Sequence, residues 1–226
     1  MKKLITLILL TFFGFGCSNT SEDSMNPFFT DYEAPYQIPP FEKIKEAHYL
    51  PAFTQGMKEQ LDEIDVITGN PESPTFENTI VELERTGKTL NKVVDVFFNL
   101  LSSNTNDEMD AIAAEISPKL SAHSDAISLN KKLFNRVHEV FEQRNELELN
   151  TEQNRLVEET HKGFIRSGVQ LDEPSMEILT QINQELSSLS VQFDQNLLKE
   201  TNEGFSLIVE DEKQLDGLPE DFRDQA

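Results

Sequence analysis

Apolar residues recur every three or four positions along most of this chain, and this spacing constrains the fold more than any other feature. The longest such series comprises Met176, Leu179, Ile182, Leu186, Leu189, Phe193 and Leu197. Because an α-helix has about 3.6 residues per turn, a series of this kind forms one apolar stripe along a helix. The spacing predicts an all-α fold built from amphipathic helices.

Turn and capping signals divide the chain into successive helices. The expected helices cover residues 44–67, 73–101, 105–127, 130–141, 151–165 and 172–197. Thr105 and Glu108 have the spacing of a capping box. Gly87 lies inside the second helix, where it costs about 1 kcal/mol relative to alanine. Pro118 is expected to kink the third helix.

Two segments depart from the helical pattern. Asn26 to Pro40 is rich in proline and aromatic residues, so we expect an extended arm that lies across the helical body. Phe205 to Glu210 has the composition of a β-strand, and a structured loop is the alternative. A single strand lacks a pairing partner. We therefore expect the partner beyond Ala226 or in another chain.

Residues 1–17 have the organisation of a lipoprotein-type signal peptide. The apolar run Leu4–Phe15 is shorter than the ~20 residues that span a bilayer, and it resembles the apolar region of an export signal. Cys17 follows small residues as in a bacterial lipobox, which predicts its lipidation. Residues 18–25 form a polar tether, and residues 26–226 form the folded part. The predicted location is the bacterial cell envelope, with a lipid anchor in the periplasm or at the outer membrane.

Two alternatives remain for this segment. One is an ordinary secretory signal with a chance cysteine, and the other is a cytosolic protein with an apolar start. Cys17 is the single cysteine in the sequence, so it has no partner for an internal disulfide and cannot form a cysteine-based zinc site.

The charge balance excludes two classes of partner. The sequence has 19 Lys and Arg against 41 Asp and Glu, a formal net charge of −22. Binding to nucleic acid depends on neutralising phosphates with Lys and Arg, and docking on an anionic membrane needs a basic face. We therefore expect no nucleic-acid partner, and membrane attachment only through the lipid anchor.

No residue of this chain is predicted to be catalytic or to bind a metal. The four histidines are His48, His123, His138 and His161. A zinc-peptidase helix needs His-Glu-x-x-His, but the run that starts at His138-Glu139 has Glu142 in its fifth position. We interpret that run as an exposed helix face. The chain also has neither a glycine-rich phosphate loop nor a Gly-x-Ser-x-Gly element.

Three tracts have sequences more specific than an amphipathic helix requires: Phe97–Asp107, Pro118–Ile127 and Gln192–Asn196. Through them the chain resembles the N-terminal region of the bacterial peptidyl-dipeptidases (dipeptidyl carboxypeptidases), in the thimet oligopeptidase family of zinc metallopeptidases. The resemblance continues, in order, through Asn26–Phe28, Pro39–Ile44, Pro51–Met57, Pro74–Ile80, Phe164–Gly168, Leu186–Asn196 and Leu215–Pro219.

This resemblance implies the helical N-terminal lobe of a two-lobed, mostly helical zinc peptidase. In that family a channel between the lobes admits short peptides, from whose C-termini dipeptides are released. A His-Glu-x-x-His helix and a downstream Glu hold the zinc in the C-terminal part. This sequence is expected to end before that part, so no catalytic or zinc-binding role is transferred to any residue here. The parent protein would use zinc and this chain would bind none.

The resemblance also implies the partners and leaves alternatives open. The expected partners are short peptides and the missing C-terminal catalytic lobe, with this lobe forming one wall of the channel. The alternatives are an oligopeptidase that cuts within short peptides, a non-enzymatic helical lipoprotein that acts as a binding module, and an unrelated helical adhesin. The reading frame after Ala226 distinguishes an enzyme from a module.

Overall fold

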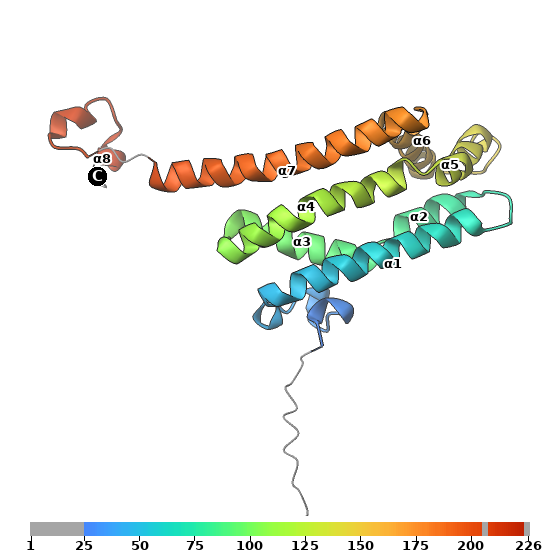
Figure 1. Cartoon of the computed structure of the whole chain (residues 1–226), viewed down its shortest axis with the longest axis horizontal. Coiled ribbons are helices and arrows are strands. Elements are labelled where there is room, and N and C mark those ends of the chain that lie inside the picture. Colours follow the sequence, from blue (N-terminus) through green and yellow to red (C-terminus); the bar gives the residue numbers. More distant parts are fainter. Residues whose placement is uncertain (1–24, 205–207, 224–226) are drawn as a thin grey trace, which may run out of the picture.

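The computed structural model describes residues 25–204 and 208–223, and these residues form helices with short connections (Figure 1). The α-helices are α1 (Tyr49–Gly69), α2 (Glu82–Arg85), α3 (Lys88–Ser103), α4 (Asp107–Ser128), α5 (Lys131–Gln143), α6 (Thr151–Arg166), α7 (Glu173–Glu203) and α8 (Glu220–Arg223). The shorter helical turns are η1 (Pro27–Phe29), η2 (Pro35–Gln37), η3 (Phe41–Lys43), η4 (Glu46–His48), η5 (Phe76–Val81) and η6 (Glu212–Leu215). No strand occurs among the described residues, which confirms the all-α prediction.

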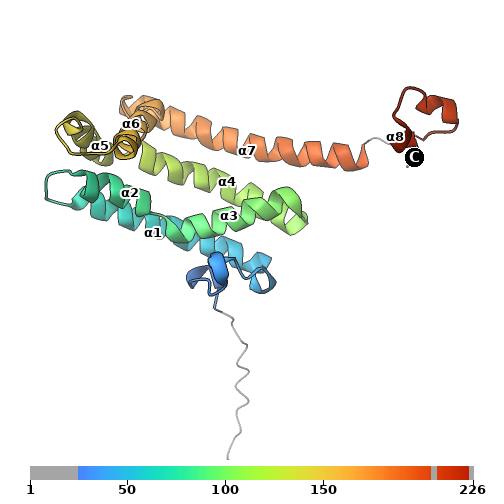
Figure 2. The ribbon, with the colours of Figure 1, turned by 180° about the vertical axis from the view of Figure 1, so that it is seen from behind.

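The long helices run side by side in an elongated bundle. α1 packs along α3, α4 lies over α1, and α7 packs along α4 on the outside of the bundle. α5 and α6 pack against each other at one end, as Figures 1 and 2 both show. The N-terminal arm lies against α3.

Two apolar cores hold the bundle together. The first joins the arm, α1, α3 and α4, and its centre is Phe97, whose ring lies 5.3 Å from that of Phe53 and 5.0 Å from that of Tyr49. The second joins the C-terminal half of α1 to η5, α5 and α6, around Ile80 and Val137. Both cores are built from the three- and four-residue apolar spacing of the sequence.

Side-chain caps fix several helix ends where the sequence predicts them. Asn130 caps α5, and Asp172 caps α7 by accepting a hydrogen bond from the Ser175 amide. Gly168, at φ +94°, closes α6 in the left-handed conformation that glycine adopts readily. The predicted capping box at Thr105 is wrong, because the Asn106 side chain caps α4 instead. α4 continues through Pro118.

The prediction of one helix over residues 73–101 is also wrong. The chain forms η5 and α2, breaks at Gly87, and resumes as α3. Gly87 has φ +76°, which an L-residue with a side chain rarely adopts. Its amide donates a 2.7 Å hydrogen bond to the Glu63 carboxylate on α1. Helical spacing of the apolar residues continues across this break, so the pattern alone does not reveal it.

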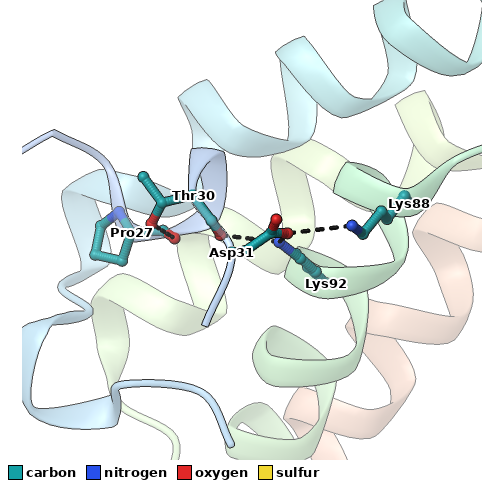
Figure 3. Close-up of polar contacts among 5 residues, drawn as sticks. All are labelled: Pro27, Thr30, Asp31, Lys88 and Lys92. Atoms are coloured by element: carbon teal, nitrogen blue, oxygen red, sulfur yellow. Dashed lines mark hydrogen bonds and ion pairs between the residues drawn. The ribbon is translucent and has the colours of Figure 1, made fainter. Parts of the chain in front are cut away.

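The N-terminal arm lies across the helices as predicted, although it includes one-turn helices. Phe28 is buried in the first core, with its ring 5.6 Å from that of Tyr49. Lys92 on α3 donates a 2.8 Å hydrogen bond to the carbonyl of Thr30 and a 3.3 Å bond to Asp31 (Figure 3). Hydrogen bonds from Lys88 and then from Lys92 lower the pKa of the Asp31 carboxyl.

Lys92 is expected to hold the arm on α3, and the neighbouring Lys88 is expected to contribute little. The side chain of Lys92 is 18% exposed and that of Lys88 is 69% exposed. Lys92→Met keeps the aliphatic stem but removes the charge-assisted hydrogen bond to Thr30. Hydrogen exchange of the arm amides should therefore accelerate roughly tenfold. Lys88→Met is the matched control and should leave that rate unchanged. Equal effects of the two variants would contradict this assignment.

Several predicted features lie outside the described residues. They include residues 1–24 with Cys17, and Phe205–Leu207 of the predicted strand. The second half of that segment, residues 208–210, forms no strand, because its backbone turns into η6 and the Glu210 amide donates to the Gln214 side chain. Within the described parts of the chain, no helix is both long enough and apolar enough to cross a membrane.

Candidate functional site

The α7 helix packs on α4 through a mainly polar face. The Asn183 amide donates to both oxygens of the Asp125 carboxylate, at 2.9 and 3.1 Å. The Gln195 amide donates a 2.9 Å hydrogen bond to the Asp110 carbonyl. Val191 adds a half-buried apolar contact with the first core. These contacts fix the rotation of α7 about its own axis.

That rotation leaves most of the apolar side of α7 uncovered. We call this surface the α7 stripe, and its members are 53–65% exposed: Ile178, Ile182, Leu186, Leu189, Phe193 and Leu197. Of the longest apolar series in the sequence, only Met176 is buried, and Leu179 is half-buried. An amphipathic stripe ordinarily faces an apolar core. Among the described residues, no apolar core covers the α7 stripe.

The α7 stripe is large enough to be an interaction surface. It extends over 19 helical steps, which correspond to about 29 Å at 1.5 Å per residue. Single exposed apolar residues are common on proteins, but a contiguous apolar surface is typical of an interface. The stripe is therefore the candidate functional site of this chain.

A polar cavity lies beside the C-terminal half of α7, and it joins two of the three sequence tracts. Its volume is about 510 Å³, and its walls include Thr105 and Asn106 from the α3–α4 connection and Gln195 and Asn196 from α7. The third tract, residues 118–127, lies in α4 and supplies Asp125 to the α7 contact. The sequence tracts thus converge on the packing of α4 against α7.

His123 has a structural position in the bundle. Its Nε2 lies 2.7 Å from the Gln60 side-chain oxygen on α1, and burial lowers the pKa of the imidazole. Gln60 in turn donates to Thr86, next to the break at Gly87. His123 therefore links α4 to α1 and to the α2–α3 connection.

The structure brings together two histidines that the sequence left apart. The Nδ1 of His138 on α5 lies 3.0 Å from the Nε2 of His161 on α6. His161 also stacks on the Phe141 ring at a centroid distance of 3.9 Å. Within residues 25–204 and 208–223, no group of three or more His, Cys, Asp or Glu side chains is placed to hold a metal ion. Antiparallel packing of α5 and α6 creates this pair, and sequence spacing carries no signal for it.

His161 and His123 should make the fold less stable as the pH falls toward 5.5. Burial lowers the pKa of His161 first, followed by the charge of His138, with Arg144 adding to the effect and Glu142 opposing it. A histidine with a lowered pKa in the folded state binds protons better when unfolded. Its contribution to stability is therefore present above the unfolded pKa of about 6.5 and is lost as the pH falls below it.

Denaturant unfolding at about pH 7.5 and about pH 5.5 measures this effect. His161→Gln keeps a polar group beside His138 but cannot titrate, so its free energy of unfolding should fall less over this range than that of the unmodified chain. Carboxyls with lowered pKa values, such as Asp172, lose their contribution only below about pH 4 and do not interfere. Identical pH dependence in both proteins would contradict the assignment.

Curated peptidases match this chain along most of its length. No family model matches the chain. Dipeptidyl carboxypeptidase of Salmonella typhimurium is 40% identical over 200 residues, which is 88% of this chain and 29% of the relative. The Escherichia coli dipeptidyl carboxypeptidase is 39% identical over 197 residues, or 87% of this chain and 29% of the relative. Oligopeptidase A of Escherichia coli is 26% identical over 195 residues, or 86% of this chain and 28% of the relative.

The chain thus spans less than a third of the length of the curated relatives it matches. The similarity nevertheless covers most of the chain, including the arm, both cores and α7. The chain is therefore homologous to dipeptidyl carboxypeptidase and oligopeptidase A along most of its own length.

Proposed function

We propose that this chain is the N-terminal helical lobe of a zinc metallopeptidase that releases dipeptides from the C-termini of oligopeptides. The observation that carries the proposal is the 40% identity with a dipeptidyl carboxypeptidase along 88% of the chain. A bundle of long helices whose α7 stripe is uncovered is consistent with a lobe that packs against further polypeptide.

In this proposal the lobe has a steric role. It forms one wall of the channel that admits short peptides, and the zinc and its ligands belong to polypeptide other than the described residues. A zinc ion in such an enzyme polarises the scissile carbonyl and activates water. The contribution of this lobe is to limit which substrates reach the metal, through its shape and its acidic surface.

A second candidate is an oligopeptidase that cuts within short peptides. The similarity to oligopeptidase A, at 26% identity over 86% of this chain, favours it as an alternative. The higher identity to dipeptidyl carboxypeptidase supports dipeptide release as the first candidate. The two activities differ in whether the enzyme needs a free carboxylate at the end of the peptide.

The test uses the complete protein, expressed from its whole reading frame, with an N-acetylated hexapeptide as substrate. We expect mass spectrometry to show dipeptides released from the C-terminus, and we expect amidation of that terminus to abolish the release. Zinc chelation should stop the reaction and added Zn²⁺ should restore it. The 226-residue chain alone is the control and should release nothing. Equal cleavage of the amidated peptide would favour the oligopeptidase, and no cleavage at all would favour the binding module.

The same proposal includes a lipid anchor at Cys17 and a location in the bacterial cell envelope. The apolar run at residues 4–15 and the small residues before Cys17 support it. We expect the protein to fractionate with membranes and to incorporate labelled palmitate, and Cys17→Ser to abolish both properties. A palmitate-free protein that stays in the soluble fraction would contradict the anchor.

A further inference from the structure

The spacing within and beside the α7 stripe is that of a helix-packing seam. Leu179, Ile182, Leu186, Leu189 and Phe193 follow one another at steps of three, four, three and four residues. This alternation is the pattern by which one helix receives the side chains of a second helix running along it. A loop or a strand would not match it over about 21 Å. The spacing therefore indicates an α-helix as the occupant of the stripe.

The charges of α7 specify the flanks of that occupant. The helix carries six acidic side chains and one basic side chain. Glu185 and Asp194 are both exposed and lie on opposite sides of the seam, since each helical step turns the chain by about 100°. Within the described residues, neither of them forms an ion pair. A helix with Lys or Arg beside its apolar positions would complement these carboxylates.

A second copy of this chain fits the stripe poorly. Two copies of α7 would bring two sets of acidic flanks together, on chains that each carry 41 acidic and 19 basic residues. Like charges across a helix pair oppose association. The relatives, of which this chain spans about 29%, carry enough further polypeptide to supply a covering helix. The assignment of the covering helix to the same protein rests on the proposed function.

We infer that the α7 stripe is the docking site for one amphipathic α-helix with basic flanks, supplied by polypeptide of the same complete protein outside the described residues. The docked helix covers Leu186, Leu189 and Phe193 with its apolar side. Its Lys or Arg side chains lie near Glu185 and Asp194.

Thiol labelling of single-cysteine variants tests the coverage. Leu189→Cys is introduced into the complete protein and into the 226-residue chain, in a Cys17→Ser background, and labelling by N-ethylmaleimide is followed by site-resolved mass spectrometry. Val66→Cys is the matched control, because Val66 is 74% exposed on α1, away from the stripe. In the 226-residue chain both thiols should react at similar rates. In the complete protein the Leu189→Cys thiol should react at least about tenfold more slowly.

Charge reversal tests the chemistry of the occupant. Glu185→Lys combined with Asp194→Lys should restore fast labelling of the Leu189→Cys thiol in the complete protein. The matched control reverses two exposed carboxylates in the α5–α6 connection, Glu146→Lys and Glu148→Lys, and should leave the protection unchanged. Protection that survives reversal of the α7 charges would overturn the basic flanks.

Three results would overturn the docking itself. The first is fast labelling of the Leu189→Cys thiol in the complete protein. The second is protection of that thiol in the 226-residue chain that increases with protein concentration. The third is cross-linking of the α7 stripe to a segment that is not helical. Peptide release is measured on the same samples. Active protein with an unprotected stripe would reject this inference and keep the proposed function, and inactive protein with a protected stripe would do the reverse.

Discussion

Phe97→Ala is expected to lower the free energy of unfolding by about 3–5 kcal/mol. The Phe97 side chain is fully buried at the centre of the first core, where it contacts Tyr49, Phe53 and Phe98 edge to face. Its removal loses apolar burial, leaves a cavity and disrupts three aromatic contacts. Urea unfolding of the chain, followed by circular dichroism, measures the change.

Phe193→Ala is the matched control, because it makes the same substitution on an apolar stripe with the same spacing. Phe193 is 65% exposed, so the substitution should change the free energy of unfolding of the 226-residue chain by no more than about 0.5 kcal/mol. A loss at Phe193 as large as that at Phe97 would show that α7 packs with its apolar side inward, contrary to the structure.

Gly56→Ala is expected to destabilise the chain by about 1–3 kcal/mol, although alanine favours helices. Gly56 on α1 lies close to the backbone of α3. A Cβ at this position would lie 2.8 Å from the backbone nitrogen and Cα of Leu90. Because the clash is with backbone, the two helices must move apart, and this movement loosens the first core. Urea unfolding again provides the measurement.

Gly163→Ala separates this packing effect from helix propensity. Gly163 lies inside α6, and a Cβ there would meet no atom within 4 Å. The same substitution should therefore stabilise the chain by up to about 1 kcal/mol. If the two variants shift stability in the same direction, the close approach of α1 and α3 is not what the structure describes.

The fold class and most helix ends can be predicted from the sequence because they depend on local interactions. Apolar spacing selects helix over strand, and capping residues such as Asn130 and Asp172 satisfy amide groups of their own helix. Proline and aromatic residues identify the N-terminal arm for the same reason. The cap of α4 is Asn106 and not the predicted Thr105, because these two neighbouring residues both have side chains that can cap a helix.

Features that depend on contacts between distant segments could not be predicted. Gly87 and Gly56 both lie in helical patterns, yet the first ends a helix with a positive φ and the second admits a neighbouring helix. Only their contacts, with Glu63 and Leu90 respectively, distinguish them. The pairing of His138 with His161 likewise requires two helices to meet.

The candidate site could be predicted only in part. The spacing from Met176 to Leu197 identifies an amphipathic helix, but spacing does not say which side meets the bundle. The polar contacts of Asn183 and Gln195 with α4 decide this. They place the apolar side outward, so most of the strongest apolar pattern in the sequence lies on the surface of the described bundle and not in its two cores.

We propose that this helical bundle is part of a longer zinc peptidase. Sequencing the reading frame beyond Ala226 is the decisive test of this proposal. We expect translation to continue into a region with a His-Glu-x-x-His helix and a downstream Glu. A stop codon directly after Ala226, or a continuation without such a motif, would contradict it.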